Sequence, residues 1–150
     1  MKVAINKCYG GFNLSPLAIK EIAKRKGKEC YFFYYNLSDK TYTPLTLEQA
    51  TEKFFCSVYS VPNPQDYNLD TLDQDGSYKS ANARANEIKI DSRPDDRTDP
   101  DLIAVIEKLG KLASGPCAKL EIIDIPDGTD YEIMEYDGLE HIAEKHKTWG

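Results

Sequence analysis

Two helix starts constrain the fold of this chain more than any other feature of its sequence. At Ser15-Pro16, a residue that can cap a helix precedes a proline, which suits the first helical position. Asp99-Pro100 repeats this arrangement later in the chain. Apolar residues follow both starts at helical spacing, and a glycine comes where each stripe ends. The sequence therefore predicts two main amphipathic helices that begin at these prolines.

Short segments of strand-forming residues surround the two helices. Residues 2–6 and 85–91 alternate apolar and polar side chains, and residues 30–35 are strand formers without alternation. If the segments 2–6 and 30–35 pair in parallel, they form a right-handed βαβ unit. Residues 118–125 and 131–136 alternate on either side of a Pro-Asp-Gly turn, so we expect them to pair as a hairpin.

The middle of the chain gives weaker signals. Thr46 and Gln49 have the spacing of a capping box, so a short helix over about 47–54 is expected before an apolar patch. Residues 62–83 are rich in Asn, Asp, Ser, Pro and Gly, which is typical of a long surface excursion. Such a loop is either a functional lid or a mobile insertion, and its length favours neither.

The C-terminal end completes the predicted fold. Residues 138–149 place Leu139, Ile142 and Ala143 roughly on one face, which predicts a short helix. The elements together predict an α+β fold in a single domain, with a mixed sheet of about four to six strands, two main helices and a short C-terminal helix. A long irregular insertion is expected at about residues 37–83.

Charge and hydropathy limit the classes of partner. The formal net charge is −6, from 25 acidic and 19 basic residues. Lys and Arg gather only at residues 24–28, at the end of the first predicted helix, where the helix dipole favours cations. A nucleic-acid partner needs a basic face, so none is expected. The first apolar run is too short for a signal peptide and no segment has the length of a membrane span, so we expect a cytoplasmic protein without a membrane partner.

Cysteine and histidine spacing gives no sign of a metal. The four cysteines include no C-x-x-C pair, which argues against a zinc site or a redox dithiol. We interpret Cys30, Cys56 and Cys117 as small buried hydrophobes. His141 and His146 are five residues apart, which on a helix separates them by about 140°, unlike the i, i+4 pair of a metal site. Neither a metal nor a cofactor is expected.

The loop Asn6-Lys7-Cys8-Tyr9-Gly10-Gly11-Phe12 lies between the first predicted strand and the first helix. Ligands bind open α/β sheets at this edge, and two glycines would let a ligand approach the backbone. The other interpretation is an ordinary tight turn with an aromatic plug. Both phosphate-binding fingerprints, G-x-G-x-x-G and G-x-x-x-x-G-K-[ST], are absent.

Charged residues elsewhere could join this loop in a site. Arg93 and Arg97 precede the second helix and could grip a phosphate or carboxylate, although the neighbouring aspartates could equally compensate them. We expect residues near the C-terminus to lie close to the same loop. The predicted ligand-binding residues are Asn6, Lys7, Cys8, Tyr9, Gly10, Gly11, Phe12, Arg93, Arg97, Tyr136, Glu140 and His141.

Three segments carry a resemblance to known sequences. They are N-K-C-Y-G-G-F near the N-terminus, the stretch from R-T-D-P to I-I-D-I-P at residues 97–126, and Y-D-G-L-E-H-I-A-E-K-H-K-T-W at residues 136–149. In these segments the chain resembles a group of short uncharacterised proteins found in phage and prophage genomes. The likeness covers about half of the chain, at its two ends.

The resemblance implies a non-enzymatic binding protein of phage or prophage type. Such a protein could act in the host cytoplasm as a counter-defence factor that sequesters a small nucleotide-like ligand or blocks a host protein. One alternative is a small enzyme that uses Cys8 or His141 as nucleophile or base. A second alternative is a structural virion or interaction protein, and a homo-oligomer is compatible with each of these functions.

Overall fold

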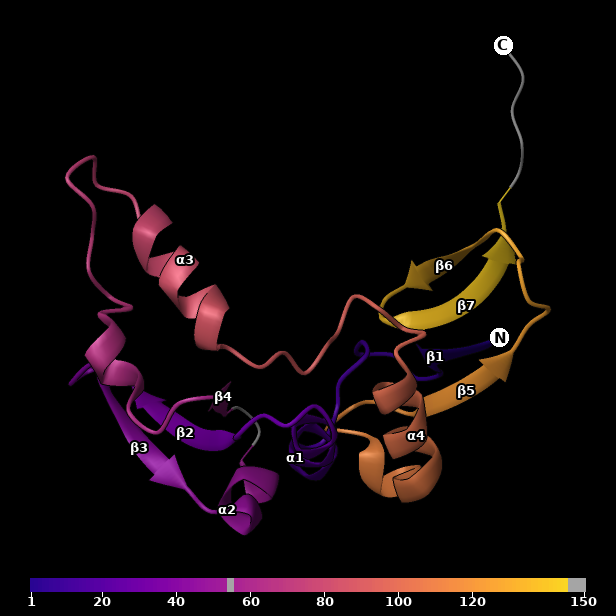
Figure 1. Ribbon diagram of the computed structural model, residues 1–150, viewed down its shortest axis with the longest axis horizontal. Helices are drawn as coiled ribbons and strands as arrows, with labels where there is room; N and C mark the ends of the chain where they lie inside the picture. The colour runs from indigo at the N-terminus through magenta and orange to yellow at the C-terminus, as the bar shows by residue number, and fades with distance from the viewer. Residues whose placement is uncertain (54–55, 146–150) are drawn as a thin grey trace. The chain divides into compact units, whose positions relative to one another are not determined.

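A computed structural model describes residues 1–53 and 56–145 of the chain (Figure 1). The predicted α+β class is confirmed, since the described residues form seven strands and four α-helices with two short 3-10 turns. The strands make three small antiparallel sheets, however, in place of the one mixed sheet that was expected. Two parts of the predicted fold lie outside the described residues. They are Phe54 and Phe55 of the expected apolar patch and residues 146–149 of the expected C-terminal helix.

The chain divides into two compact units. The terminal unit consists of Met1–Ile22 and Ser92–Gly150, and the central unit consists of Ala23–Asp91. The single-domain organisation stays a prediction.

The terminal unit is built from both ends of the chain. Its elements are β1 (Lys2–Asn6), α1 (Pro16–Arg25, whose last three residues belong to the central unit), α4 (Pro100–Leu109), the 3-10 turn η2 (Gly110–Ala113), β5 (Leu120–Asp124), β6 (Tyr131–Tyr136) and β7 (Leu139–Glu144). Both predicted helix starts are confirmed. The Ser15 hydroxyl accepts a hydrogen bond from the Ala18 N–H at 3.2 Å, and the Asp99 carboxylate accepts one from the Asp101 N–H at 3.1 Å.

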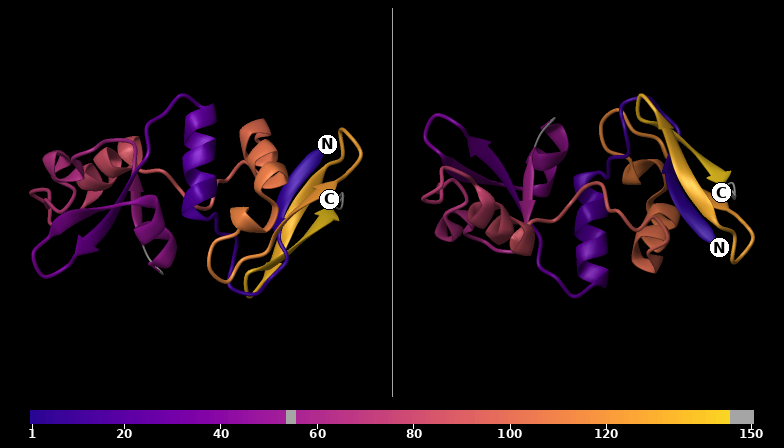
Figure 2. Two further views of the ribbon diagram at one scale, coloured as in Figure 1. Left: turned by 90° about the horizontal axis from the view of Figure 1, so that it is seen from below. Right: turned by 90° about the horizontal axis from the view of Figure 1, so that it is seen from above.

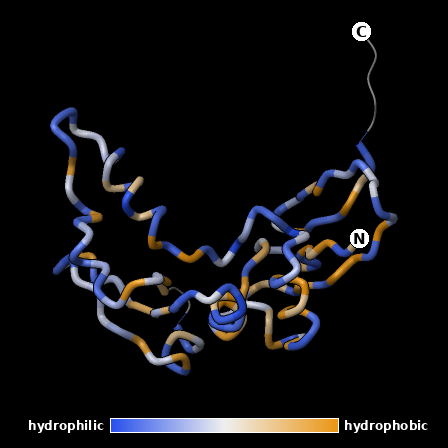
Figure 3. The backbone as a smooth tube through the Cα atoms, in the orientation of Figure 1, coloured by the Kyte–Doolittle hydropathy of each residue, from blue (hydrophilic) through white to orange (hydrophobic). Residues whose placement is uncertain are grey.

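Two antiparallel sheets of two strands each form the terminal unit. β1 pairs with β5, and β6 pairs with β7, so the expected hairpin between residues 118–125 and 131–136 is wrong. In both views of Figure 2 the β6–β7 ribbon lies beside β1 and β5. Buried aliphatic side chains of β1 and α4 fill the core beneath, and Figure 3 shows the hydrophobic colour concentrated on β5 and much of α4.

The segment expected to form a C-terminal helix is instead strand β7, over its described part. Asp137 and Gly138, with φ of 50° and 86°, form a two-residue turn between β6 and β7. A turn with positive φ at both central residues matches the twist of a hairpin, and Asp-Gly is among the sequences that favour it most strongly. This local signal outweighs the weak helical spacing of the apolar residues that follow.

The central unit contains β2 (Tyr31–Asn36), β3 (Thr41–Leu45), α2 (Leu47–Glu52), β4 (Ser57–Tyr59), the 3-10 turn η1 (Pro64–Tyr67) and α3 (Lys79–Ile88). Its sheet has the order β3-β2-β4, so β2 does not pair with β1 and no parallel βαβ unit forms. The capping box at α2 is confirmed by hydrogen bonds in both directions between Thr46 and Gln49.

Two expectations for the central unit differ from the structure. Segment 37–83 is more regular than an irregular insertion, since it contains β3, α2, β4, η1 and the start of α3. Residues 85–88 belong to α3 and not to a strand. Ala81 and Ile88 are buried seven residues apart on one face of α3, which is the spacing of a helix that packs against a core.

Candidate functional site

Asn6 organises the loop that follows β1. Its side chain is fully buried, and its amide nitrogen donates to the carbonyl of Cys8 at 2.6 Å and to the carbonyl of Gly138 at 2.7 Å. Its side-chain oxygen accepts from the Lys119 N–H at 2.9 Å. The loop is therefore tied at one residue both to the segment before β5 and to the β6–β7 turn.

A buried ion pair lies next to this amide. The Arg97 guanidinium binds both carboxylate oxygens of Glu140, at 2.8 and 3.1 Å, and the two side chains are 10% and 6% exposed. The Glu140 carboxylate also accepts from the Asn6 N–H at 2.8 Å, and the guanidinium lies 3.8 Å from the centre of the Phe12 ring. Each charge thus has partners that offset its loss of water, as a buried charge requires.

The two glycines of the loop allow the β6–β7 turn to approach closely. Gly10 and Gly11 have φ of 112° and 98°, and the Gly10 N–H donates to the carbonyl of Asp137 at 3.0 Å. A Cβ atom added to Gly138 would lie against the amide nitrogen of Gly11 and 2.6 Å from that of Gly10. The Phe12 side chain is 2% exposed and packs against the Arg97 guanidinium. This arrangement accounts for the glycines by packing, as in the tight-turn interpretation.

The structure brings most of the predicted site residues together. Main-chain or side-chain contacts join Asn6, Cys8, Gly10, Gly11, Phe12, Arg93, Arg97 and Glu140. By contrast, the side chains of Lys7, Tyr9, Tyr136 and His141 are exposed. Their role in ligand binding stays a prediction, as does that of the cluster.

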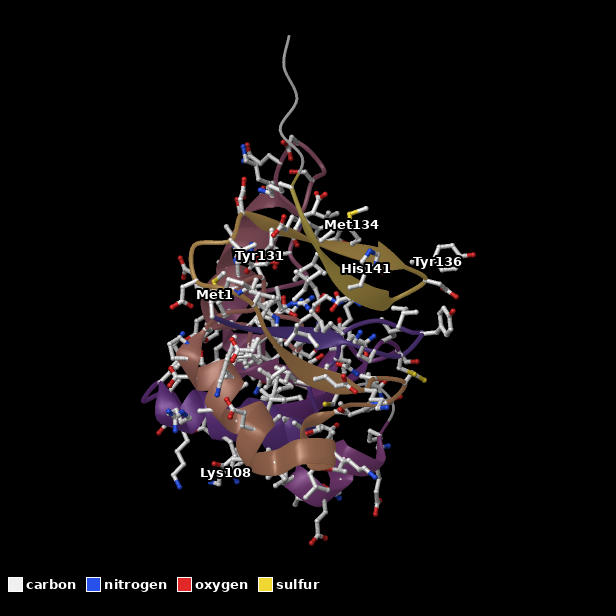
Figure 4. All side chains as sticks on the ribbon, turned by 90° about the vertical axis from the view of Figure 1, so that its right-hand side faces the viewer. Met1, Lys108, Tyr131, Met134, Tyr136 and His141 are labelled. Atoms are coloured by element: carbon white, nitrogen blue, oxygen red, sulfur yellow. The ribbon has the colours of Figure 1, made fainter. Side chains whose placement is uncertain are left out.

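The β6–β7 ribbon has an inner and an outer face, because side chains alternate along its strands. Glu140 lies on the inner face, where it meets Arg97. The outer face consists of Glu132, Met134, Tyr136, Leu139, His141 and Ala143. Met134 is 42% exposed and Tyr136 is 77% exposed, and Figure 4 shows both with His141 directed away from the rest of the unit.

The predicted site includes Tyr136 and His141 of this outer face but not Met134. Met134 lies directly opposite His141 in the strand register. The signal that could have found it is the Asp137-Gly138 turn, because a hairpin there places Met134 and Tyr136 on one face.

The ribbon is also strongly acidic. Residues 131–144 contain five carboxylates and no lysine or arginine. Glu140 is paired with Arg97, whereas Glu132, Glu135, Asp137 and Glu144 are exposed. The exposed aromatic and methionine side chains therefore lie among exposed carboxylates.

A separate hollow of about 450 Å³ opens between the start of β1 and α4. Lys2 and Glu107 form an ion pair of 2.9 Å beside it. The hollow shares no residue with the predicted site. Its lining consists of Met1, Lys2, Thr98, Pro100, Ile103, Ala104 and Glu107.

The central unit contains a cluster of aromatic rings. The ring centres of Phe33, Tyr42 and Tyr59 lie between 5.7 and 6.1 Å apart, and the ring of Tyr35 lies tilted against that of Tyr42, with their centres 4.8 Å apart. The Tyr35 hydroxyl donates to Asp70 at 2.7 Å, and this bond to a carboxylate is the main cause that raises the pKa of Tyr35 to about 12. Burial, followed by a hydrogen bond with Tyr59, raises the pKa of Tyr42 well above its ordinary value.

The cysteines differ from their expected burial. Cys117 is exposed, with φ of 60° in the turn before β5, so its interpretation as a buried hydrophobe is wrong. Cys30 and Cys56 are half-buried, and burial raises the pKa of the Cys56 thiol. His141 lies on the outer face of β7, whereas the carbonyl of Cys8 is bonded to Asn6 inside the loop. This placement gives no support to a pair of Cys8 and His141.

Within residues 1–53 and 56–145, no group of His, Cys, Asp and Glu side chains could hold a metal ion. None of the helices in the same ranges is long and apolar enough to cross a membrane. No family model, no curated protein and no solved structure matches the chain.

Proposed function

We propose that this protein is a non-enzymatic binding protein, and that the outer face of the β6–β7 ribbon contacts a partner protein. The observation that carries the proposal is the exposure of Tyr136 and Met134 on a ribbon whose inner face is fixed by the buried pair of Arg97 and Glu140. Tyrosine and methionine are enriched in protein interfaces, and tyrosine contributes strongly to binding energy. A rigid support reduces the entropy lost when such side chains bind.

The polar groups of the predicted site favour a protein partner over a small anionic ligand. The guanidinium of Arg97 is bound by Glu140, and the amide of Asn6 is bound by backbone groups on two sides. A small anion would have to displace Glu140 from a buried position, which is costly. The exposed side chains instead lie on one face of a two-stranded ribbon, which suits a broad contact better than an enclosed ligand.

The resemblance to phage and prophage proteins gives the proposal a biological setting. A phage protein with such a surface would bind a host protein and block it, as a counter-defence factor does. Catalysis is not needed for this function, because occupancy of the host protein's surface is sufficient.

Site-specific photo-crosslinking tests the proposal. A photo-reactive phenylalanine analogue replaces Tyr136 in one variant and Met134 in another, and the proteins are irradiated in bacterial cells that express them. Lys108 is the matched control position, since it is exposed on α4, away from the outer face (Figure 4). We expect the same discrete protein adduct from positions 136 and 134 and none from position 108.

Two results would contradict the proposed function. One is an equal pattern of adducts from all three positions, which would indicate random collisions. The other is a small metabolite that stays bound to the purified chain in native mass spectrometry and is lost in the Arg97→Ala variant. The second result would return the glycine loop to the role of a ligand site.

A further inference from the structure

Strand β6 has a free edge. Among the strands that the structure describes, only β7 pairs with β6, in a sheet of two strands. In an antiparallel pair, alternate residues direct their N–H and C=O groups away from the partner strand. One side of residues 131–136 therefore presents backbone groups that a further strand could bind.

This edge lacks several of the usual features that prevent strand addition. Residues 131–136 contain no proline and no lysine, and all six pair with β7 in continuous register, without a bulge. Tyr131, Ile133 and Tyr136 are residue types that favour strands. The only charges on the strand are the exposed carboxylates of Glu132 and Glu135.

The charge of the ribbon determines what kind of strand can bind. A second copy of this chain carries the same net charge of −6 and the same five carboxylates in its ribbon, so pairing of two ribbons would bring like charges together. A basic segment added at the edge of β6 is complementary to the carboxylates of that strand, Glu132 and Glu135. Charge therefore favours a basic partner over self-association.

We propose that the free edge of β6 binds an extended basic segment of the partner protein as an added strand. This inference rests on the proposed function and specifies how the partner binds. Glu132 and Glu135 are three residues apart and lie on opposite faces of the strand. The segment accordingly has two Lys or Arg residues three positions apart, with an apolar residue between them that packs on Met134.

A displayed library of random twelve-residue peptides tests the inference, with the purified full chain as bait. We expect the enriched peptides to carry the pair of basic residues at that spacing. Binding of the best synthetic peptide is then measured by fluorescence anisotropy. Glu132→Lys and Glu135→Lys should each weaken binding about tenfold. Glu144→Lys is the control, because it makes the same charge change at an exposed position of β7, away from the free edge.

A second measurement separates strand addition from attraction between charges. N-methylation of alternate backbone amides of the peptide removes the hydrogen bonds of one edge and leaves every side chain unchanged. We expect methylation in one of the two alternate sets to weaken binding more than about tenfold, since several main-chain bonds are lost together. Amide hydrogen exchange of residues 131–136 should slow when the unmodified peptide binds.

The inference is overturned if no peptide is enriched, if the enriched peptides lack the basic pair, or if both methylated sets bind as well as the parent. Its failure can be distinguished from failure of the proposed function. If photo-crosslinking at Tyr136 still captures a discrete partner, the outer face binds by another mode and only the added strand is wrong. If crosslinking also fails, both proposals are wrong.

Discussion

In the terminal unit the segment that carries the candidate site is fixed by a buried ion pair, whereas the sheet of the central unit packs around aromatic rings. The ion pair joins Arg97 to Glu140, and Asn6 binds the same carboxylate. The rings are those of Phe33, Tyr42 and Tyr59. The β6–β7 ribbon is held by a few directional bonds between distant parts of the chain, whereas the central sheet is held by contact area.

This difference indicates which unit tolerates the loss of a polar or charged side chain. A buried charge that loses its partner keeps its cost of desolvation, so the ion pair holds the β6–β7 ribbon in one position or fails as a whole. Aromatic rings attract one another in several geometries, so the loss of one polar group changes their packing little. The outer face of the ribbon lies on the side opposite to this ion pair.

The largest expected effect is that of Glu140→Ala. The variant leaves the guanidinium of Arg97 buried without its carboxylate, and we expect the free energy of unfolding to fall by about 3–5 kcal/mol. Chemical denaturation followed by circular dichroism measures the change, and hydrogen exchange assigns it to the terminal unit. Glu135, directly opposite in the strand register and exposed, is the matched control. Glu135→Ala should cost less than about 0.5 kcal/mol, and equal losses would contradict a special role for the buried pair.

The next largest effect is expected from Gly138→Ala, which tests the contact between the ribbon turn and the glycine loop. The new Cβ would collide with the backbone of Gly10 and Gly11, and φ of 86° is unfavourable for alanine. Strain and overpacking together should lower the free energy of unfolding by about 2–5 kcal/mol.

Gly128→Ala isolates the contribution of backbone strain. Gly128 has a similar φ of 79°, but an added Cβ there would have no atom within 4 Å. We expect it to cost about 1–2 kcal/mol, from the left-handed conformation alone. If thermal or chemical denaturation gives the same loss in free energy of unfolding for both glycine variants, the close approach at Gly138 adds nothing to the cost of backbone strain.

Local chemistry was enough to predict the helix starts and several strands. Ser15, Asp99 and Thr46 cap their helices as expected, because a cap depends only on residues within one turn. The α+β class follows from the order of such elements. The β7 strand was missed because weak helical spacing was given more weight than the Asp137-Gly138 turn.

Pairing between distant strands could not be predicted in the same way. The contact of β1 with β5 joins residues more than a hundred positions apart, and no residue in either strand specifies the other. Asn6, Arg97 and Glu140 belong to one predicted site and the structure places them in contact, but the sequence does not predict their mutual hydrogen bonds. The sequence contains these charges without showing that they neutralise one another.

A smaller effect is expected from Tyr42→Phe in the central unit. The variant keeps the ring that packs on Phe33 and Tyr59 and removes only the hydroxyl that hydrogen-bonds with Tyr59. The loss of one hydrogen bond should lower the free energy of unfolding by about 1 kcal/mol. A loss as large as that of Glu140→Ala, measured by the same denaturation, would show that the aromatic cluster also depends on directional bonds.

The smallest effect concerns the pH dependence of the central unit. The hydrogen bond from Tyr35 to Asp70 raises the pKa of Tyr35 to about 12, compared with about 10 for an unfolded tyrosine. Because the folded state holds this proton more tightly, the contribution to stability is complete below about pH 10 and is lost as the pH rises through about 12. Ultraviolet titration of tyrosinate should show late-titrating phenols, among them Tyr42 and Tyr35. The contribution of Tyr35 should be missing in Tyr35→Phe and should titrate earlier in Asp70→Asn, which removes the negative charge. An unchanged titration curve in both variants would show that the carboxylate does not hold the proton.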